Sequence, residues 1–344
     1  MMAYRLLAAG HAELVDVDEP EPGPGEAVLR VLGAGVCRTD LAVRRNGLAD
    51  LPVTLGHEIV GEVVALGPGA RGVSIGETVA VYELIGCGRC APCGRGEDNL
   101  CREAPPAVPG ITRDGGMAEQ VVVPARNLVA LGALDPVEAA PLTDAGMTAL
   151  HAVERGRAWL TRDAVVVVVG VGGLGHLALQ FLAATADTRV IAVDVDAARL
   201  AFAEQLGAAH GVRAGEGAAE QVLAFNAGRR VDVVFDFVGS QESVDLAARV
   251  TGRGGAILVT GGGGGRLCVR AQMGAGRAPE REVTILHTFG GTRADLVRAL
   301  ALAEAGRVRT RVQSFGLHEA AHALTELEAG RVLGRAVIAP CIAT

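Results

Sequence analysis

The pattern of apolar and polar positions divides the chain into a β-rich first part and a second part in which strands and helices alternate. In the first part, short alternating segments predict strands, and the Pro/Gly-rich turn 19–25 separates two of them. A helix is expected to begin near Pro141 and to run towards Arg155. The expected strands of this part lie at residues 4–8, 12–17, 26–34 and 59–66 and within 115–131.

The second part is organised around residues 164–194. Five consecutive valines at 165–169 predict a strand buried on both faces. A glycine-rich turn at 170–175 follows, then apolar residues at helical spacing, and then a second strand at 189–193 that ends on Asp194. This succession of strand, glycine turn, helix and strand is the dinucleotide-binding fingerprint in its proper context.

Three of the four glycines of the turn have their own function in this fingerprint. Gly170 permits the tight turn, Gly172 lets the backbone approach a pyrophosphate, and Gly175 lets helix and strand pack closely. The helix N-terminus faces the phosphate, and Asp194 can bond an adenosine ribose.

Strands and helices continue to alternate after Asp194, so the predicted fold is α/β with a doubly wound parallel sheet. The pentaglycine 261–265 is either a close backbone approach to a cofactor or a slack loop. The expected helices are 197–206, 243–250, 292–305 and 318–329, and the expected strands are 231–238, 255–260, 282–287 and 335–340.

Composition narrows the class of protein. A length of 344 residues with 50% apolar content supports two domains. There is no uncharged apolar run of about 18 residues, and the N-terminus turns acidic early, so we expect a cytoplasmic protein with neither membrane span nor signal peptide. A net charge of −7 without a basic tract argues against nucleic-acid binding. Every one of the 32 basic residues is arginine, which excludes chemistry that needs a lysine amine.

Four of the seven cysteines form a compact cluster with the spacing Cys-x2-Cys-x2-Cys-x7-Cys. In a reducing compartment such a cluster indicates a metal site rather than disulfides. Four thiolates close a tetrahedral zinc site and leave no open position, so this site is predicted to be structural. An iron–sulfur cluster and a zinc-ribbon DNA reader are the alternatives, and the acidic chain disfavours the second. The four cysteines are Cys87, Cys90, Cys93 and Cys101, and the arginines expected to compensate their charge are Arg89, Arg95 and Arg102.

Two further segments of the first part carry possible metal ligands. Cys37 lies in Gly-Val-Cys-Arg-Thr-Asp, and His57 and Glu58 follow twenty positions later. On local sequence alone, core residues and metal ligands are equally good explanations for Cys37 and His57. Asp144, near the predicted helix start, is either a helix cap or a functional carboxylate.

Taken in order, these motifs resemble the zinc-dependent alcohol dehydrogenases of the medium-chain dehydrogenase/reductase family over essentially the whole chain. The series also includes Asp-Gly-Gly-x-Ala-Glu at 114–119 and Gly-Arg-x-Val at 334–337. The resemblance implies a GroES-like catalytic domain over 1–147 with a structural zinc lobe at 86–102. It further implies a Rossmann NAD-binding domain over 148–289 and a return of 290–344 to the catalytic domain.

The resemblance also assigns metal ligands. Cys37, His57 and Asp144 are expected to hold a catalytic zinc, because a bacterial subgroup has Asp in a Pro-Leu-Thr-Asp-Ala-Gly segment like this one. Glu58 is placed as a neighbouring partner or transient ligand. The hydroxyl of Thr39 is expected to take the alcohol proton and relay it to the nicotinamide ribose.

For the cofactor, the resemblance implies NAD(H) bound by the glycine turn, with Arg38 and Arg335 on the pyrophosphate. Asp194 would repel the 2′-phosphate of NADP, although Arg199 lies one turn further on. The expected cofactor contacts are Arg38, Gly170, Gly172, Gly173, Leu174, Gly175, Asp194, Arg199, Val238 and Arg335.

The substrate pocket departs from the family pattern. Ala42 stands where many relatives end the proton relay with histidine, so the proton must leave by another route. Glu83, Leu84 and Ile85 occupy a segment that faces the substrate in relatives, and Glu83 either turns outward or contacts a cationic or hydroxyl-bearing substrate. Met117 and Gln120 replace common aromatic residues.

Three functions therefore compete. The first is an NAD-dependent zinc alcohol dehydrogenase or carbonyl reductase that acts on a small alcohol, aldehyde or ketone. The second is a zinc-type reductase of activated C=C or C=N bonds, and the third is a non-catalytic NAD-binding redox sensor. Relatives are dimers or tetramers, so a homo-oligomer is expected.

Overall fold

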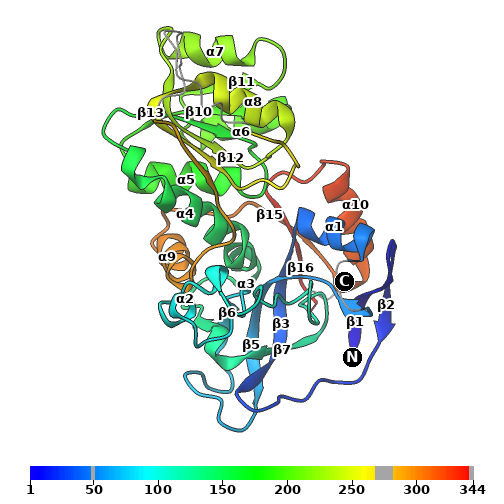
Figure 1. Ribbon diagram of the computed structural model, residues 1–344. Coiled ribbons are helices and arrows are strands. Elements are labelled where there is room, and N and C mark those ends of the chain that lie inside the picture. The colour runs from blue at the N-terminus through cyan, green and yellow to red at the C-terminus, as the bar shows by residue number, and fades with distance from the viewer. Residues whose placement is uncertain (48–50, 268–281, 341–344) are drawn as a thin grey trace. The chain divides into compact units, whose positions relative to one another are not determined.

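The computed structural model describes residues 1–47, 51–267 and 282–340, and the chain forms two compact units (Figure 1). The first unit comprises Met1–Met147 and Gly290–Thr344, and the second comprises Thr148–Phe289. The first unit is thus built from two separate pieces of sequence. No helix within the described ranges has the length and apolar character needed to cross a bilayer.

The first unit consists mainly of antiparallel sheets. Its larger sheet has seven strands in the order β15-β16-β3-β5-β6-β8, with β7 also paired to β3, and a smaller sheet has the order β2-β1-β4. Inward-facing apolar side chains such as Leu29, Ile59 and Val63 form its core. The strands are β1 (Met2–Ala8), β2 (His11–Asp16), β3 (Glu26–Val36), β4 (Val53–Thr54), β5 (Glu58–Leu66), β6 (Thr78–Val81), β7 (Gln120–Pro124), β8 (Leu128–Ala130), β15 (Val312–Phe315) and β16 (Arg335–Ile338).

The helices of the first unit are short and join or cover these strands. The α-helices are α1 (Arg38–Asn46), α2 (Ala91–Gly94), α3 (Pro136–Ala139), α9 (Arg293–Glu304) and α10 (Ala320–Glu328), and the 3₁₀ turns are η1 (Asp98–Leu100), η2 (Ala125–Asn127), η3 (Ala140–Thr143) and η5 (Leu317–Glu319). Helix α4 (Ala145–Arg155) begins in the first unit and ends in the second.

The second unit is a parallel sheet of six strands in the order β11-β10-β9-β12-β13-β14. Counted within the unit this is 3-2-1-4-5-6, the Rossmann order, whose ligand crevice lies where the order reverses, between β9 and β12. All five valines of β9 are buried, as their pattern predicts. The elements are β9 (Val165–Val169), β10 (Arg189–Asp194), β11 (His210–Arg213), β12 (Val231–Asp236), β13 (Thr251–Val259), β14 (Thr284–His287), α5 (Gly175–Thr185), α6 (Ala197–Gln205), α7 (Ala218–Phe225), α8 (Gln241–Val250) and the turn η4 (Arg157–Trp159).

The structure differs from the predicted elements in a few places. The expected helix start near Pro141 is the 3₁₀ turn η3, and α4 begins only after Asp144, whose φ of −123° and ψ of −69° interrupt the helix. The strands expected within 115–131 are present as the short β7 and β8, with η2 between them. Helix α1, directly after β3, and the pair β11 and α7 have no counterpart among the predicted elements.

Candidate active site and structural metal lobe

Four potential metal ligands of the first unit converge: Cys37, His57, Glu58 and Asp144 have ligand atoms within 4.8 Å of one another. We call these four residues the catalytic cluster. Cys37 lies between β3 and α1, while His57 and Glu58 lie at the start of β5. Antiparallel pairing sets Gly35 opposite Glu58, so the end of β3 lies beside the beginning of β5. Asp144 comes from the junction of η3 and α4.

The imidazole of His57 is oriented by two carboxylates. Its Nε2 lies 3.5 Å from Asp144 Oδ2, and its Nδ1 lies 3.3 Å from Asp40 Oδ1. Asp40 is fully buried and also accepts the backbone N–H of Cys37 at 2.7 Å. A proton on Nδ1 facing Asp40 leaves the Nε2 lone pair for a metal.

Asp40 is a residue to which the sequence interpretation gives no function. It is the third residue of α1 and forms a capping box with Cys37. The function of Asp40 could therefore have been inferred from the local sequence, because it is an acidic residue three positions after a predicted metal ligand at a helix start.

Glu58 is held by a buried arginine from the C-terminal piece of the chain. Arg335 Nε donates to Glu58 Oε2 at 3.0 Å, and its Nη2 bonds the other oxygen, Oε1. The same Nη2 lies 3.4 Å from Asp144 Oδ2. Gly35 makes room for this carboxylate, because a Cβ there would lie 1.8 Å from Glu58 Oε2. The predicted contact of Arg335 with a pyrophosphate stays a prediction.

The charges of the catalytic cluster depend on one another. Burial disfavours the imidazolium of His57, but the Asp40 charge and the hydrogen bonds to Asp144 and Asp40 raise its pKa well above the usual value. Burial also opposes ionisation of Asp144, yet the hydrogen bond and charge of His57 and the charge of Arg335 lower its pKa. Burial raises the pKa of Glu58 to about 7 against the opposing effect of Arg335.

These donors fit a zinc ion. A thiolate, an imidazole and carboxylates are zinc ligands, and ligands about 2.0–2.1 Å from a tetrahedral ion lie roughly 3.4 Å apart. The 3.5 Å between His57 Nε2 and Asp144 Oδ2 agrees with that edge. With Cys37, Glu58 and Asp144 negative and Arg335 positive, a dication balances the charge of these four side chains, and the buried carboxylate of Asp40 adds one further negative charge behind His57.

Thr39 and Arg38 are the first residues of α1 next to this cluster. The hydroxyl of Thr39 lies 3.6 Å from Cys37 Sγ. Both side chains are exposed, so they are reachable by a ligand.

The four-cysteine lobe has the geometry of a closed zinc site. Its sulfur–sulfur separations are 3.9 Å between Cys87 and Cys93, 3.4 Å between Cys90 and Cys93, and 4.0 Å between Cys90 and Cys101. Zinc–sulfur bonds of about 2.3 Å in a tetrahedron give an edge of roughly 3.8 Å. All four thiols are free of disulfides. Hydrogen bonds from the backbone N–H groups of Ala104 and Cys87 lower the pKa of Cys101 to about 6, which favours the thiolate that binds metal.

Two of the arginines expected to compensate this lobe have carboxylate partners of their own. Arg95 pairs with Glu97 and Arg89 with Glu103. Arg126, distant in sequence, also lies at the lobe, where it pairs with Asp98 at 3.2 Å and bonds the carbonyl of Gly86. The expectation considered only the sequence neighbours of the cysteines and therefore missed Arg126.

The glycine turn of the second unit has the conformation that its sequence predicts. Gly170 has a φ of +87°, which only glycine adopts readily, and a Cβ on Gly175 would lie 1.8 Å from the Gly170 carbonyl oxygen. A Cβ on Gly172 would meet no atom within 4 Å, so the backbone is open there to a ligand. The carboxylate of Asp194 accepts the N–H of Val171 at 2.7 Å and that of Asp196 at 3.0 Å.

The remaining predicted cofactor residues lie around this turn. Gly173 and Leu174 precede α5, and Val238 follows β12 with its Cγ2 2.6 Å from where a Cβ on Gly170 would be. Arg199 is in the first turn of α6. Within the pentaglycine, Gly261, Gly263 and Gly265 pack closely on the backbone of residues 238–240, which leaves no room for a Cβ, whereas a Cβ on Gly262 or Gly264 would meet no atom within 4 Å.

The predicted substrate segment lies inside the first unit. Leu84 is buried and Ile85 is half-buried, with its N–H bonded to the Ala107 carbonyl at 2.8 Å. Glu83 is 5% exposed, so its side chain does not turn outward.

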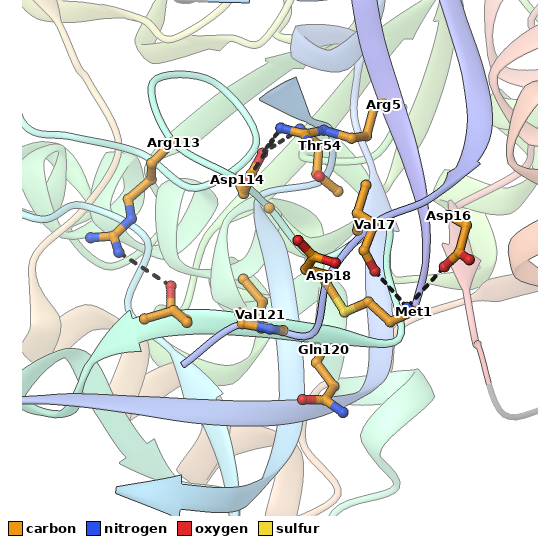
Figure 2. A pocket seen from close by; sticks show the side chains of 13 residues that line it. Met1, Arg5, Asp16, Val17, Asp18, Thr54, Arg113, Asp114, Gln120 and Val121 are labelled. Carbon is orange, nitrogen blue, oxygen red and sulfur yellow. Dashed lines mark hydrogen bonds and ion pairs between the residues drawn. The ribbon is translucent and has the colours of Figure 1, made fainter. Parts of the chain in front are cut away.

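A hollow of about 720 Å³ on the first unit shares no residue with either metal cluster (Figure 2). Its cationic groups are engaged: Arg5 pairs with Asp114 at 3.1 Å, and the N-terminus pairs with Asp16 at 3.1 Å (Figure 2). Arg113 pairs with Glu26, which lies outside the lining, at 3.0 Å. Its cationic groups are therefore already paired, and among its charged lining residues only the exposed carboxylate of Asp18 has no partner in the described ranges.

Comparison with known proteins gives consistent matches along the chain. The family model "Alcohol dehydrogenase GroES-like domain" matches residues 23–133, and "Zinc-binding dehydrogenase" matches residues 173–305. An NAD-dependent alcohol dehydrogenase of Sulfurisphaera tokodaii is 33% identical over 99% of this chain and all of its own. A D-arabinose 1-dehydrogenase (NADP(+)) of Saccharolobus solfataricus is 34% identical over 94% of this chain and 93% of its own. The crystal structure of the alcohol dehydrogenase of Aeropyrum pernix has a TM-score of 0.91 and 37% identity, with 99% of this chain and 100% of that chain covered.

Proposed function

Because the chain belongs to the zinc-containing medium-chain alcohol dehydrogenases and is an NAD(P)-dependent enzyme of that family, we propose the function of each residue in its site. The reaction is hydride exchange between an alcohol or carbonyl compound and NAD(H). The observation that carries the proposal is the convergence of Cys37, His57, Glu58 and Asp144 within 4.8 Å.

Cys37, His57 and Asp144 hold the catalytic zinc, and Arg335 keeps Glu58 beside them as a further carboxylate. A zinc ion bound there supplies a Lewis acid that lowers the pKa of an alcohol hydroxyl. Asp40 orients His57, and the buried guanidinium of Arg335 offsets one of the three negative charges. Cys87, Cys90, Cys93 and Cys101 hold a structural zinc.

The proton is handled by the hydroxyl of Thr39. This hydroxyl lies near Cys37 and is exposed, so it can accept the alcohol proton and pass it to the ribose of the nicotinamide. The methyl group of Ala42 cannot carry a proton as a histidine at this position would, so the proton leaves through water.

The cofactor is NAD(H), held at the glycine turn 170–175 with the adenosine ribose on Asp194. Gly173, Leu174, Arg199 and Val238 surround it, and Arg38 and Arg335 contact its pyrophosphate. The substrate is a small alcohol, aldehyde or ketone. The protein acts in the cytoplasm as a homodimer or homotetramer.

The test is to measure metal content together with turnover. The purified protein should contain two zinc ions per chain and reduce NAD with alcohols or oxidise NADH with aldehydes and ketones. Turnover confined to activated C=C bonds, or zinc release by NADH without turnover, would contradict the proposal.

A further inference from the structure

Glu83 is a buried carboxyl that the proposed mechanism leaves unused. It lies two residues after β6 and is 5% exposed, yet no hydrogen bond or ion pair joins it to another residue in the described ranges. It is not among the ligands of the catalytic cluster. A buried carboxyl is costly unless it finds a hydrogen-bonding partner, so a partner from outside the chain is expected.

The backbone on both sides of Glu83 is fixed. The side-chain amide of Asn127 donates to the carbonyl oxygens of Tyr82 at 2.8 Å and Leu84 at 3.2 Å. The hydroxyl of Tyr82 donates to the Gly291 carbonyl at 3.0 Å. Because Tyr82 and Leu84 are both buried and clamped in this way, the backbone that carries Glu83 is held in place between them.

The carboxyl of Glu83 lies close enough to the catalytic cluster to interact electrostatically with it. Burial is the largest effect on this carboxyl and raises its pKa well above the usual range. A neutral carboxylic acid both donates and accepts a hydrogen bond. A hydroxyl group complements it in both respects and brings no second buried charge.

We propose that Glu83 determines substrate choice by hydrogen-bonding a second hydroxyl group of the alcohol, so that diols and other polyhydroxy compounds are preferred over plain monoalcohols. This inference rests on the alcohol dehydrogenase function proposed above. Glu83 then acts as a specificity residue that binds a part of the substrate other than the reacting hydroxyl.

The test compares butan-1-ol, butane-1,2-diol, butane-1,4-diol and 4-aminobutan-1-ol as substrates of the zinc-loaded enzyme. Glu83→Leu should lower kcat/KM for at least one diol roughly tenfold and leave butan-1-ol unchanged or improved, because the lost hydrogen bond serves only the diol. Glu83→Gln keeps a donor and an acceptor and should retain the diol preference within about threefold. Glu13→Leu, on the exposed strand β2, is the matched control and should change neither substrate class.

Calorimetric titration of the same zinc-loaded proteins without NAD measures binding when no turnover occurs. If the unmodified enzyme oxidises no alcohol, the proposed function fails, and the ratio of diol to monoalcohol Kd still tests Glu83. The proposal is overturned if Glu83→Leu lowers kcat/KM equally for diols and for butan-1-ol. It is also overturned if the unmodified protein shows no preference for diols. If Glu83→Gln lowers kcat/KM only for 4-aminobutan-1-ol, the proposal is overturned, because Glu83 then binds an ammonium group of the substrate rather than a hydroxyl group. Zinc content and Tm of each variant show whether it is folded.

Discussion

At the scale of single residues, the carboxylates in and beside the catalytic cluster occupy different positions around His57. Asp144 is near the imidazole of His57, Glu58 is bound to Arg335, and Asp40 lies behind the ring. All three are carboxylates, so only their positions distinguish a zinc ligand from a residue that orients or neutralises the ligands. Substitution of each one tests a different property.

Asp144→Ala should remove the catalytic zinc and lower turnover at least a hundredfold, while the fold and one zinc ion per chain remain. The physical reason is the loss of one of three protein ligands, which a water molecule replaces without its negative charge. Metal analysis and NADH formation measure both effects. The exposed Asp18→Ala is the control, and full metal content with normal activity in Asp144→Ala would refute the assignment.

Asp40→Asn should weaken the catalytic zinc about 10- to 100-fold without affecting the zinc of the four-cysteine lobe. An amide keeps the size of the carboxylate and one acceptor oxygen, but it removes the negative charge that stabilises a proton on Nδ1 of His57. Competition with a chelator of known affinity measures the change. An unchanged zinc affinity would show that Asp40 serves only to cap α1.

The unmodified enzyme should prefer NAD to NADP. Two unit charges about 4 Å apart at an effective dielectric near 20 repel by roughly 4 kcal/mol, on the order of a thousandfold in affinity before relaxation. Asp194→Asn keeps an acceptor for the N–H of Val171 and removes the charge, so it should narrow the ratio of kcat/KM for the two cofactors. A higher kcat/KM with NADPH in the unmodified enzyme would contradict this prediction.

At the scale of elements, the sheet of the first unit assembles the catalytic site. Strand β16 pairs with β3, and β3 pairs with β5, so Arg335, Cys37 and Glu58 come from three neighbouring strands or their ends. The four-cysteine lobe has only the short α2 and η1 as regular structure. A metal ion is therefore expected to contribute much of its order.

Cys90→Ser should remove the structural zinc and leave the catalytic zinc bound. The lobe loses one of four thiolates, and its few hydrogen-bonded turns cannot replace the metal. We expect a lower Tm and faster amide hydrogen exchange over residues 86–102, with one zinc ion per chain. Loss of both ions together would show that the two sites are coupled.

At the scale of the whole molecule, both metal clusters belong to the first unit and the dinucleotide fingerprint belongs to the second. Each unit has its own hydrophobic core. Metal binding and binding of the adenine half of the cofactor are therefore expected to depend on separate parts of the chain.

Protein stripped of both zinc ions by a chelator should still bind NADH, with a Kd within about tenfold of that of the loaded enzyme. The glycine turn and Asp194 need no metal for their conformation. Enhancement of NADH fluorescence measures the binding. A complete loss of binding would show that the metal sites support the second unit.

The sequence by itself determined the family, the fold class, the enzyme class and the four-cysteine site, and all of these are confirmed. It could do so because their signals are local: a run of valines before a glycine turn, and four thiols within one short segment. Strand and helix periodicity likewise depend on neighbouring residues, whereas the short β11 and α7 are too weakly patterned to be seen.

Only the tertiary structure decided which distant side chains meet. Strand register set Gly35 opposite Glu58, and the closing strand β16 brought Arg335 to the same carboxylate. Asp40 behind His57 and the burial of Glu83 were decided in the same way. The physical reason is that distance, burial and charge pairing arise between residues far apart in the chain, and no local pattern encodes them.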